Sequence, residues 1–137
     1  MSFADSQSNA EILLGTAEAR IVLAGTVSKG DALGYSGGWV RALATAAGVI
    51  QIRCVAGEDG VSGQTIVAYF DKTIIGGARF SGGTVNGKLY VAEGTDVGEY
   101  TQTAPSTATD ANTEVGVMIS ATEAMVQPAH TADSVVA

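Results

Sequence analysis

Histidine and cysteine, on which much enzyme and metal chemistry depends, are nearly absent from this sequence, which has one of each. A catalytic triad needs a fixed imidazole, and a zinc site needs several such ligands at defined spacing. His130 lies near the C-terminal end, in a segment that we expect to be loose. Cys54 lies in the apolar run 50–55, which indicates a buried structural thiol. No phosphate-binding glycine motif occurs. We therefore expect no enzyme, no metal and no other cofactor.

Charged residues are also scarce, at 15% of the chain, and the basic ones stop early. All seven lysines and arginines lie at or before Lys88, where seven of the 14 acidic residues balance them, so the net charge of −7 belongs to the C-terminal third. Nucleic-acid binding needs a basic stripe, and a membrane helix needs about 18 apolar residues in succession. We expect neither partner. The N-terminus lacks the apolar core of a secretory leader, so we expect synthesis and folding in a cytoplasm.

Two loops gather carboxylates of the kind that bind Ca²⁺, namely GEDGVSG at 57–63 and DANTE at 110–114. Neither has the ligand spacing of an EF-hand loop. Because glycine, asparagine and aspartate are also ordinary turn residues, we interpret both segments as turns. A sugar-binding aromatic platform is not favoured, because aromatic residues make up only 6% of the chain.

Glycine, by contrast, is abundant, with 18 residues that separate short runs rich in β-branched side chains. Strand-length segments at intervals of about 8–12 residues, joined by glycine turns, predict an all-β fold, either a β-sandwich or a small barrel. Only Ser8–Ala19 admits a helix. We divide the chain into an N-terminal arm (residues 1–18), a β domain (19–128) and a flexible C-terminal tail (129–137).

The strand pattern within the β domain occurs twice. GDALGY at 30–35 and WVRAL at 39–43 lead to IQIRCVAG and QTIVAY. Further on, NGKLYV at 86–91 and EYTQT at 99–103 lead to EVGVMISA and EAMVQP. All β-hairpins share part of this pattern, but the repeated order of elements predicts pseudo-repeated strand units.

Several apolar residues, some within this pattern and some before it, are candidates for contact with other molecules. Trp39 follows a glycine turn and is expected either in the core or at a subunit contact. The apolar run in the arm is either a first core strand or a segment that docks on a neighbour. The subunit-interface candidates are Trp39, Tyr69 and Phe70, and the candidates in the arm are Phe3, Ile12, Leu13 and Leu14.

Four segments of the chain resemble the capsid decoration (head cement) proteins of tailed bacteriophages. They are VSKGDALGY, RCVAGEDGVSGQTIVAYF, GGTVNGKLYVAEGTDVGEYTQTAP and VGVMISATEAMVQP, and the resemblance covers roughly residues 25–128. The order of the elements carries it, since no single residue is diagnostic. Tail and fibre proteins of phages have similar β-rich sequences.

The resemblance implies a β-tulip or SH3-like barrel that binds the outside of the expanded capsid and cements neighbouring major capsid proteins. It also implies a homotrimer on the outer capsid surface of the virion, whose N-terminal arm adds a strand to the major capsid protein. On this interpretation the arm residues bind the capsid. The alternative is another β-rich virion component, such as a tail-tube or fibre module.

Overall fold

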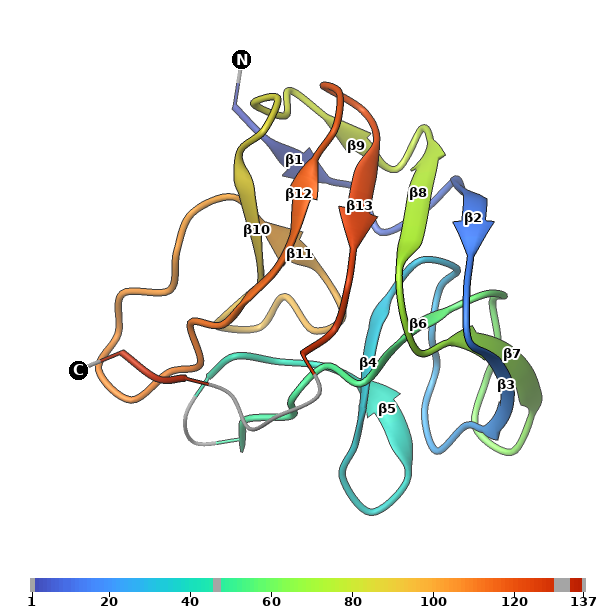
Figure 1. Ribbon diagram of the computed structural model, residues 1–137. Helices are drawn as coiled ribbons and strands as arrows, with labels where there is room; N and C mark the ends of the chain where they lie inside the picture. Colours follow the sequence, from blue (N-terminus) through green and yellow to red (C-terminus); the bar gives the residue numbers. More distant parts are fainter. Residues whose placement is uncertain (1, 46–47, 130–133, 137) are drawn as a thin grey trace.

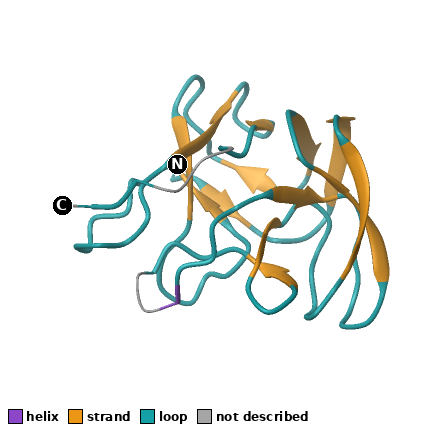
Figure 2. Cartoon of the chain, turned by 60° about the horizontal axis from the view of Figure 1, so that its bottom comes forward, coloured by secondary structure: helices purple, strands orange, loops and turns teal. Residues whose placement is uncertain are grey.

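The computed structural model of the protein describes residues 2–45, 48–129 and 134–136. These residues form strands, turns and loops and no α-helix, so the predicted all-β class is confirmed. The strands make two larger antiparallel sheets, one above the other in Figure 1, and a small two-stranded one. Figure 2 shows the loops that join them.

The larger sheet has six strands in the order β11-β10-β12-β13-β8-β2. Its register shifts at Leu89/Tyr90 and between Ile12 and Leu14, where the ladder bulges. Beside it, β1 pairs with β9. The bounds are β1 (Ala4–Asp5), β2 (Ala10–Gly15), β8 (Thr73–Gly77), β9 (Phe80–Ser81), β10 (Lys88–Val91), β11 (Tyr100–Thr101), β12 (Glu114–Met118) and β13 (Ala124–Val126).

The second sheet has five strands in the order β3-β7-β6-β4-β5. Leu23, just after β3, makes an isolated parallel bridge with Trp39 of β5, so the sheet curls until its two outer strands come close. No continuous ladder closes either sheet within the described residues, so the fold is an open sandwich and not the predicted alternative of a barrel. The bounds are β3 (Glu18–Val22), β4 (Ala32–Tyr35), β5 (Trp39–Arg41), β6 (Cys54–Ala56) and β7 (Thr65–Tyr69).

The two sheets contain the same unit twice, which confirms the predicted pseudo-repetition. The first unit has the order β3-β7-β6-β4-β5, and the second has β8-β13-β12-β10-β11. Each strand of the first unit has a counterpart in the second, in the same place along the chain and in the same antiparallel pairing. The remaining strands β1, β2 and β9 lie outside this repeat and join the units.

The middle strands of the five-stranded sheet are buried on both faces, which gives the fold two hydrophobic cores. Ala32 and Val55 face a first core, which they share with the six-stranded sheet. The alternate residues Leu33, Cys54 and Ala56 face a second core inside the curled sheet. Because successive side chains point to opposite faces of a strand, one strand can serve both cores.

The N-terminal segment differs from its prediction. Ser8–Ala19 forms no helix; it contributes β2 and the start of β3, which pair with β8 and β7. Residues 2–18 are therefore part of the folded domain and not an arm beside it. Their alanine, glutamate and leucine residues favour a helix locally, and pairing with distant strands overrides that preference.

The C-terminal segment is also attached to the domain where it is described. Val135 forms an antiparallel bridge with Ala111, and Val136 exchanges main-chain hydrogen bonds with Thr109 and Asp110. These contacts hold residues 134–136 against the loop at 109–112, and the flexibility expected of the tail (129–137) stays a prediction. His130 lies outside the described residues.

Two glycines provide a matched test of packing in the five-stranded sheet. A methyl group at Gly34 in β4 would meet the carbonyl oxygen of Gln51, whereas one at Gly48 would have nothing within 4 Å. We expect Gly34→Ala to lower the free energy of unfolding by about 1–3 kcal/mol, because overpacking displaces the backbone. Gly48→Ala should leave it unchanged or raise it by up to about 1 kcal/mol. Urea unfolding measures both, and equal effects would contradict this packing.

Candidate functional site

The most strongly organised polar group in the structure surrounds Arg79, between β8 and β9. Its side chain is fully buried. Asp5 of β1 holds the guanidinium in a bidentate ion pair, with Nε to Oδ1 at 2.8 Å and Nη2 to Oδ2 at 3.0 Å. Asp31 pairs with Nη1 at 2.9 Å. Both carboxylates are buried as well, so three charged side chains share one dry site.

The remaining donors of Arg79 are also used. Its Nη1 donates to the carbonyl of Lys29 at 3.0 Å, and its Nη2 donates to that of Gly98 at 3.2 Å. The guanidinium carbon lies 5.6 Å and 5.5 Å from the ring centroids of Phe80 and Tyr100, within cation–π range. Burial lowers the pKa of Arg79, but the carboxylates outweigh it, and the pKa is raised overall. Arg79 therefore stays charged in the interior.

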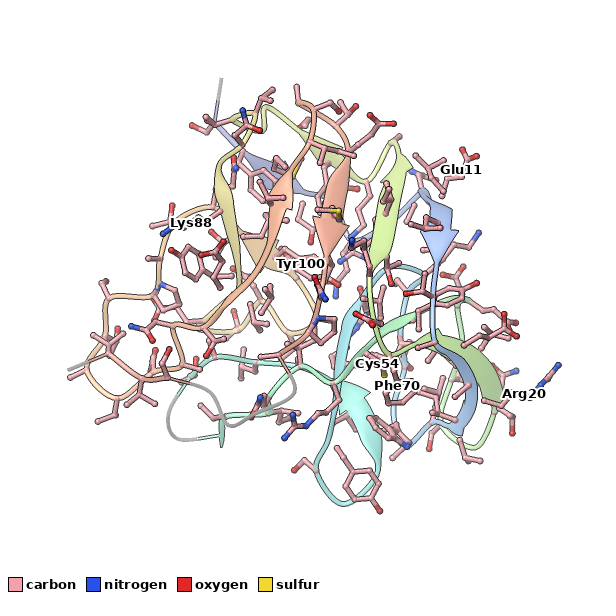
Figure 3. All side chains as sticks on the ribbon, in the orientation of Figure 1. Glu11, Arg20, Cys54, Phe70, Lys88 and Tyr100 are labelled. Carbon is pink, nitrogen blue, oxygen red and sulfur yellow. The ribbon has the colours of Figure 1, made fainter. Side chains whose placement is uncertain are left out.

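Asp31 extends this network to the other sheet. Its Oδ2 accepts from Arg41 Nε of β5 at 2.7 Å, and its Oδ1 accepts from Gln7 Nε2 at 3.1 Å. Tyr100 adds a second link, since its hydroxyl donates to the carbonyl of Gly30 at 2.9 Å. Burial raises the pKa of Tyr100 well above its usual value. Figure 3 shows Tyr100 in the interior of the molecule.

This arrangement is structural in character. Each charged side chain has an opposite charge beside it, and the guanidinium has no open side. A nucleophile or general base needs an unsatisfied atom that faces a space for substrate. The network instead joins β1, β5, β11 and the turn before β4, and so fixes the two sheets relative to one another.

A groove of about 400 Å³ lies beside the network. Its lining includes Phe3, Glu93, Asp96 and Glu99. Burial, followed by the charges of Asp5 and Asp96, raises the pKa of Glu99. The groove is therefore acidic, but among the described residues no group of three or more histidine, cysteine or acidic side chains is placed to hold a metal ion.

Two carboxyl groups, those of Glu93 and Asp110, meet next to the C-terminal segment. A side-chain hydrogen bond with Asp110, and then burial, raises the pKa of Glu93. The Oε2 atom of Glu93 is buried without a hydrogen-bond partner in the described part of the chain. Asp110 is itself 3% exposed, and its carbonyl accepts from the Val136 amide at 2.9 Å. The setting of Glu93 therefore favours its protonated form.

An aromatic cluster lies beside the β4–β5 hairpin of the five-stranded sheet. It includes two of the three predicted interface residues. Trp39 packs edge-to-face against Tyr35 and Phe70, with ring centroids 5.4 Å and 5.5 Å apart. Tyr35 is 65% exposed. Tyr35 was not among the predicted interface residues, although the hairpin register pairs it directly with Trp39. Tyr69 lies elsewhere, with its ring over Gly15 and Gly57.

The four predicted arm residues do not form one surface. Phe3 stacks on Phe80 with centroids 5.8 Å apart, and Ile12 packs against the first core. Leu13 and Leu14 are 48% and 40% exposed on the outer strand β2. Two of the four, Phe3 and Ile12, therefore pack inside the protein, and only Leu13 and Leu14 remain available on the surface.

Cys54 is buried in the second core, as predicted, and burial raises its pKa to about 12. The thiol therefore stays protonated and unreactive at neutral pH.

Comparison with protein-family models, with curated proteins and with solved structures finds no match. In the described part of the chain, no helix has the length and apolar character that crossing a membrane requires.

Removal of one carboxylate tests the Arg79 network. We expect Asp5→Ala to lower the free energy of unfolding by about 3–5 kcal/mol, because it removes the bidentate partner of a buried charge. The double variant Asp5→Leu/Arg79→Met should lose less, since it removes both charges. Urea unfolding at pH 7 measures these values, with Glu11→Ala on the exposed face of β2 as control. A loss below about 1 kcal/mol for Asp5→Ala would show that Asp5 is not the essential partner of a buried charge.

The Glu93–Asp110 contact predicts a pH dependence. A carboxyl whose pKa is raised by folding stabilises the folded state while it is protonated, and this stabilisation is lost as pH rises through the folded pKa. The amide of Glu93→Gln cannot ionise, so the stability of this variant relative to wild type should increase as pH rises above 4.5, the ordinary pKa. Unfolding at pH 4 to 7 measures the difference. A difference that does not change with pH for Glu93→Gln would contradict the prediction.

Proposed function

We propose that this protein is a structural component of a tailed-phage virion that binds the outer surface of the expanded capsid and stabilises it by joining neighbouring major capsid proteins. The resemblance of residues 25–128 to capsid decoration proteins supplies the identity of the partner. The all-β sandwich and the saturated Arg79 network suit a protein that binds without performing chemistry.

The observation that carries the proposal is the aromatic cluster of Tyr35, Trp39 and Phe70, in which Tyr35 is 65% exposed while Trp39 and Phe70 are half-buried against the second core. Aromatic side chains bury a large area at little entropic cost, and they are enriched among the residues that contribute most to protein interfaces. The cluster is on the five-stranded sheet and the segment that follows β7, whereas the acidic residues between Lys88 and Pro128 belong to the other repeat and its loops. We therefore orient the aromatic end toward the shell and the acidic part toward solvent.

The physical basis of stabilisation would be mass action. A ligand that binds the expanded lattice and not its precursor shifts the equilibrium toward the expanded form. Three copies gathered on the capsid as a homotrimer would touch several capsid subunits and gain affinity through multivalency, so no single contact has to be strong.

Binding to expanded, undecorated phage heads tests the proposal. We expect saturable binding in groups of three at three-fold positions, with a higher melting temperature of the heads. Sedimentation gives the number of bound copies, and cryo-imaging gives their positions. Tyr35→Ala should weaken binding by roughly tenfold, because it truncates an exposed aromatic contact. Val85→Ala, at a valine that is 52% exposed near the other sheet, is the matched control.

The possible outcomes separate the alternatives. Failure to bind heads, together with stacking into tubes or fibres, would reject the capsid assignment in favour of a tail component. Equal binding by Tyr35→Ala and wild type would reject the aromatic cluster as the contact surface.

A further inference from the structure

The outer strand β3 has an unprotected edge. It pairs with β7 on one side only, over five residues without a shift in register. Edge strands are usually blunted by a bulge, a proline or very short length, because their free main-chain groups can pair with another chain. The outer strand β2 has such a bulge, and β11 has only two residues. The edge of β3 has neither device, and of the usual protections it has only the charged side chains of Glu18 and Arg20.

The hydrogen bonds to β7 show which main-chain groups of β3 point outward. The Phe70 amide donates to the carbonyl of Ala17, and the Leu23 amide donates to that of Gln64. Odd-numbered residues therefore face β7, and the main-chain groups of even-numbered residues face away from it. Near Val22 the edge is closed by the bridge from Leu23 to Trp39. The open groups are thus those of Glu18 and Arg20.

The side chains of these two residues have opposite charges and point to the same face of the strand. Both are exposed, and neither forms an ion pair within the described part of the chain. Figure 3 shows Arg20 directed away from the body of the molecule. If two copies of β3 lie antiparallel with Ala19 opposite Ala19, Glu18 of each copy lies opposite Arg20 of the other. The same register aligns the open main-chain groups of both residues.

We propose that β3 is a self-complementary edge that pairs two copies of this protein about a two-fold axis centred on Ala19. The contact joins the main-chain groups of Glu18 and Arg20 by hydrogen bonds and forms two symmetric Glu18–Arg20 pairs. The small side chain of Ala19 suits the closer approach at a non-hydrogen-bonded position of an antiparallel ladder. The acidic residues between Lys88 and Pro128 lie in the other repeat, so repulsion between them opposes this contact little. The proposal does not depend on the proposed function.

Charge reversal and mixing test this register. Sedimentation equilibrium of the wild-type protein up to about 1 mM should show a monomer–dimer equilibrium, since a short ladder gives weak affinity. Glu18→Arg and Arg20→Glu should each weaken dimerisation by roughly 10- to 100-fold, because each places like charges opposite one another twice. The double variant Glu18→Arg/Arg20→Glu should restore it. An equimolar mixture of the two single variants should form a heterodimer, because their strands then have opposite charges.

Each result decides the proposal. Glu11→Arg, on the bulged edge of β2, is the matched control and should dimerise like wild type. A wild-type protein that stays monomeric at about 1 mM would show that a second copy does not pair with this edge. The partner of β3 would then have to be a strand of another protein. Dimerisation that survives both single reversals, or that the mixture fails to restore, would reject the register. Head binding is not needed for any of these readings, so this proposal and the proposed function can fail separately.

Discussion

The interaction of the Arg79 guanidinium with the carboxylates of Asp5 and Asp31 is the constraint on which the relative position of the two sheets depends. Its three members come from β1, from the turn before β4 and from the segment between β8 and β9. A buried ion pair contributes little net stability compared with an apolar replacement, but removal of one partner leaves a costly unpaired charge. Any arrangement that separates these segments is therefore strongly disfavoured. The network thus selects one packing among those that the apolar residues alone would allow.

The hydrophobic cores complete the arrangement that this network fixes. β4 and β6 supply alternate residues to the two cores, so the curled five-stranded sheet is both a wall of the first core and the container of the second. A chain of 137 residues in a sandwich would ordinarily rely on one core. Here the duplicated unit makes two cores possible. Each copy contributes one sheet to the core between them, and the curled sheet of the first copy encloses the second core.

Local patterns were sufficient to predict the strand class, the repeat and the burial of Cys54. Glycine turns between β-branched runs are short-range signals, and the repeated order of these runs is visible along the chain. The pairing of β2 and β3 was not predictable in this way, because AEILLGTAEAR has no strand alternation and its partners lie far away in the sequence. The Arg79 network has no local pattern either. An isolated arginine in GGARF and a single aspartate in the N-terminal segment indicate nothing until the fold brings them together. The exposed Tyr35 was missed because its importance comes from its register with Trp39.

The pairing of the N-terminal strands with strands of the second half has a consequence for folding during synthesis. β3 to β7 pair among themselves, so the first repeat has its own strands available as soon as it has left the ribosome. The N-terminal segment has to wait, since β2 pairs with β8, β1 pairs with β9 and Asp5 pairs with Arg79. Residues that are made before the first repeat are thus among the last to find their partners. Because such distant pairings must close large loops, the final step of folding is expected to be slow, and it is completed only when the second repeat supplies the missing partners.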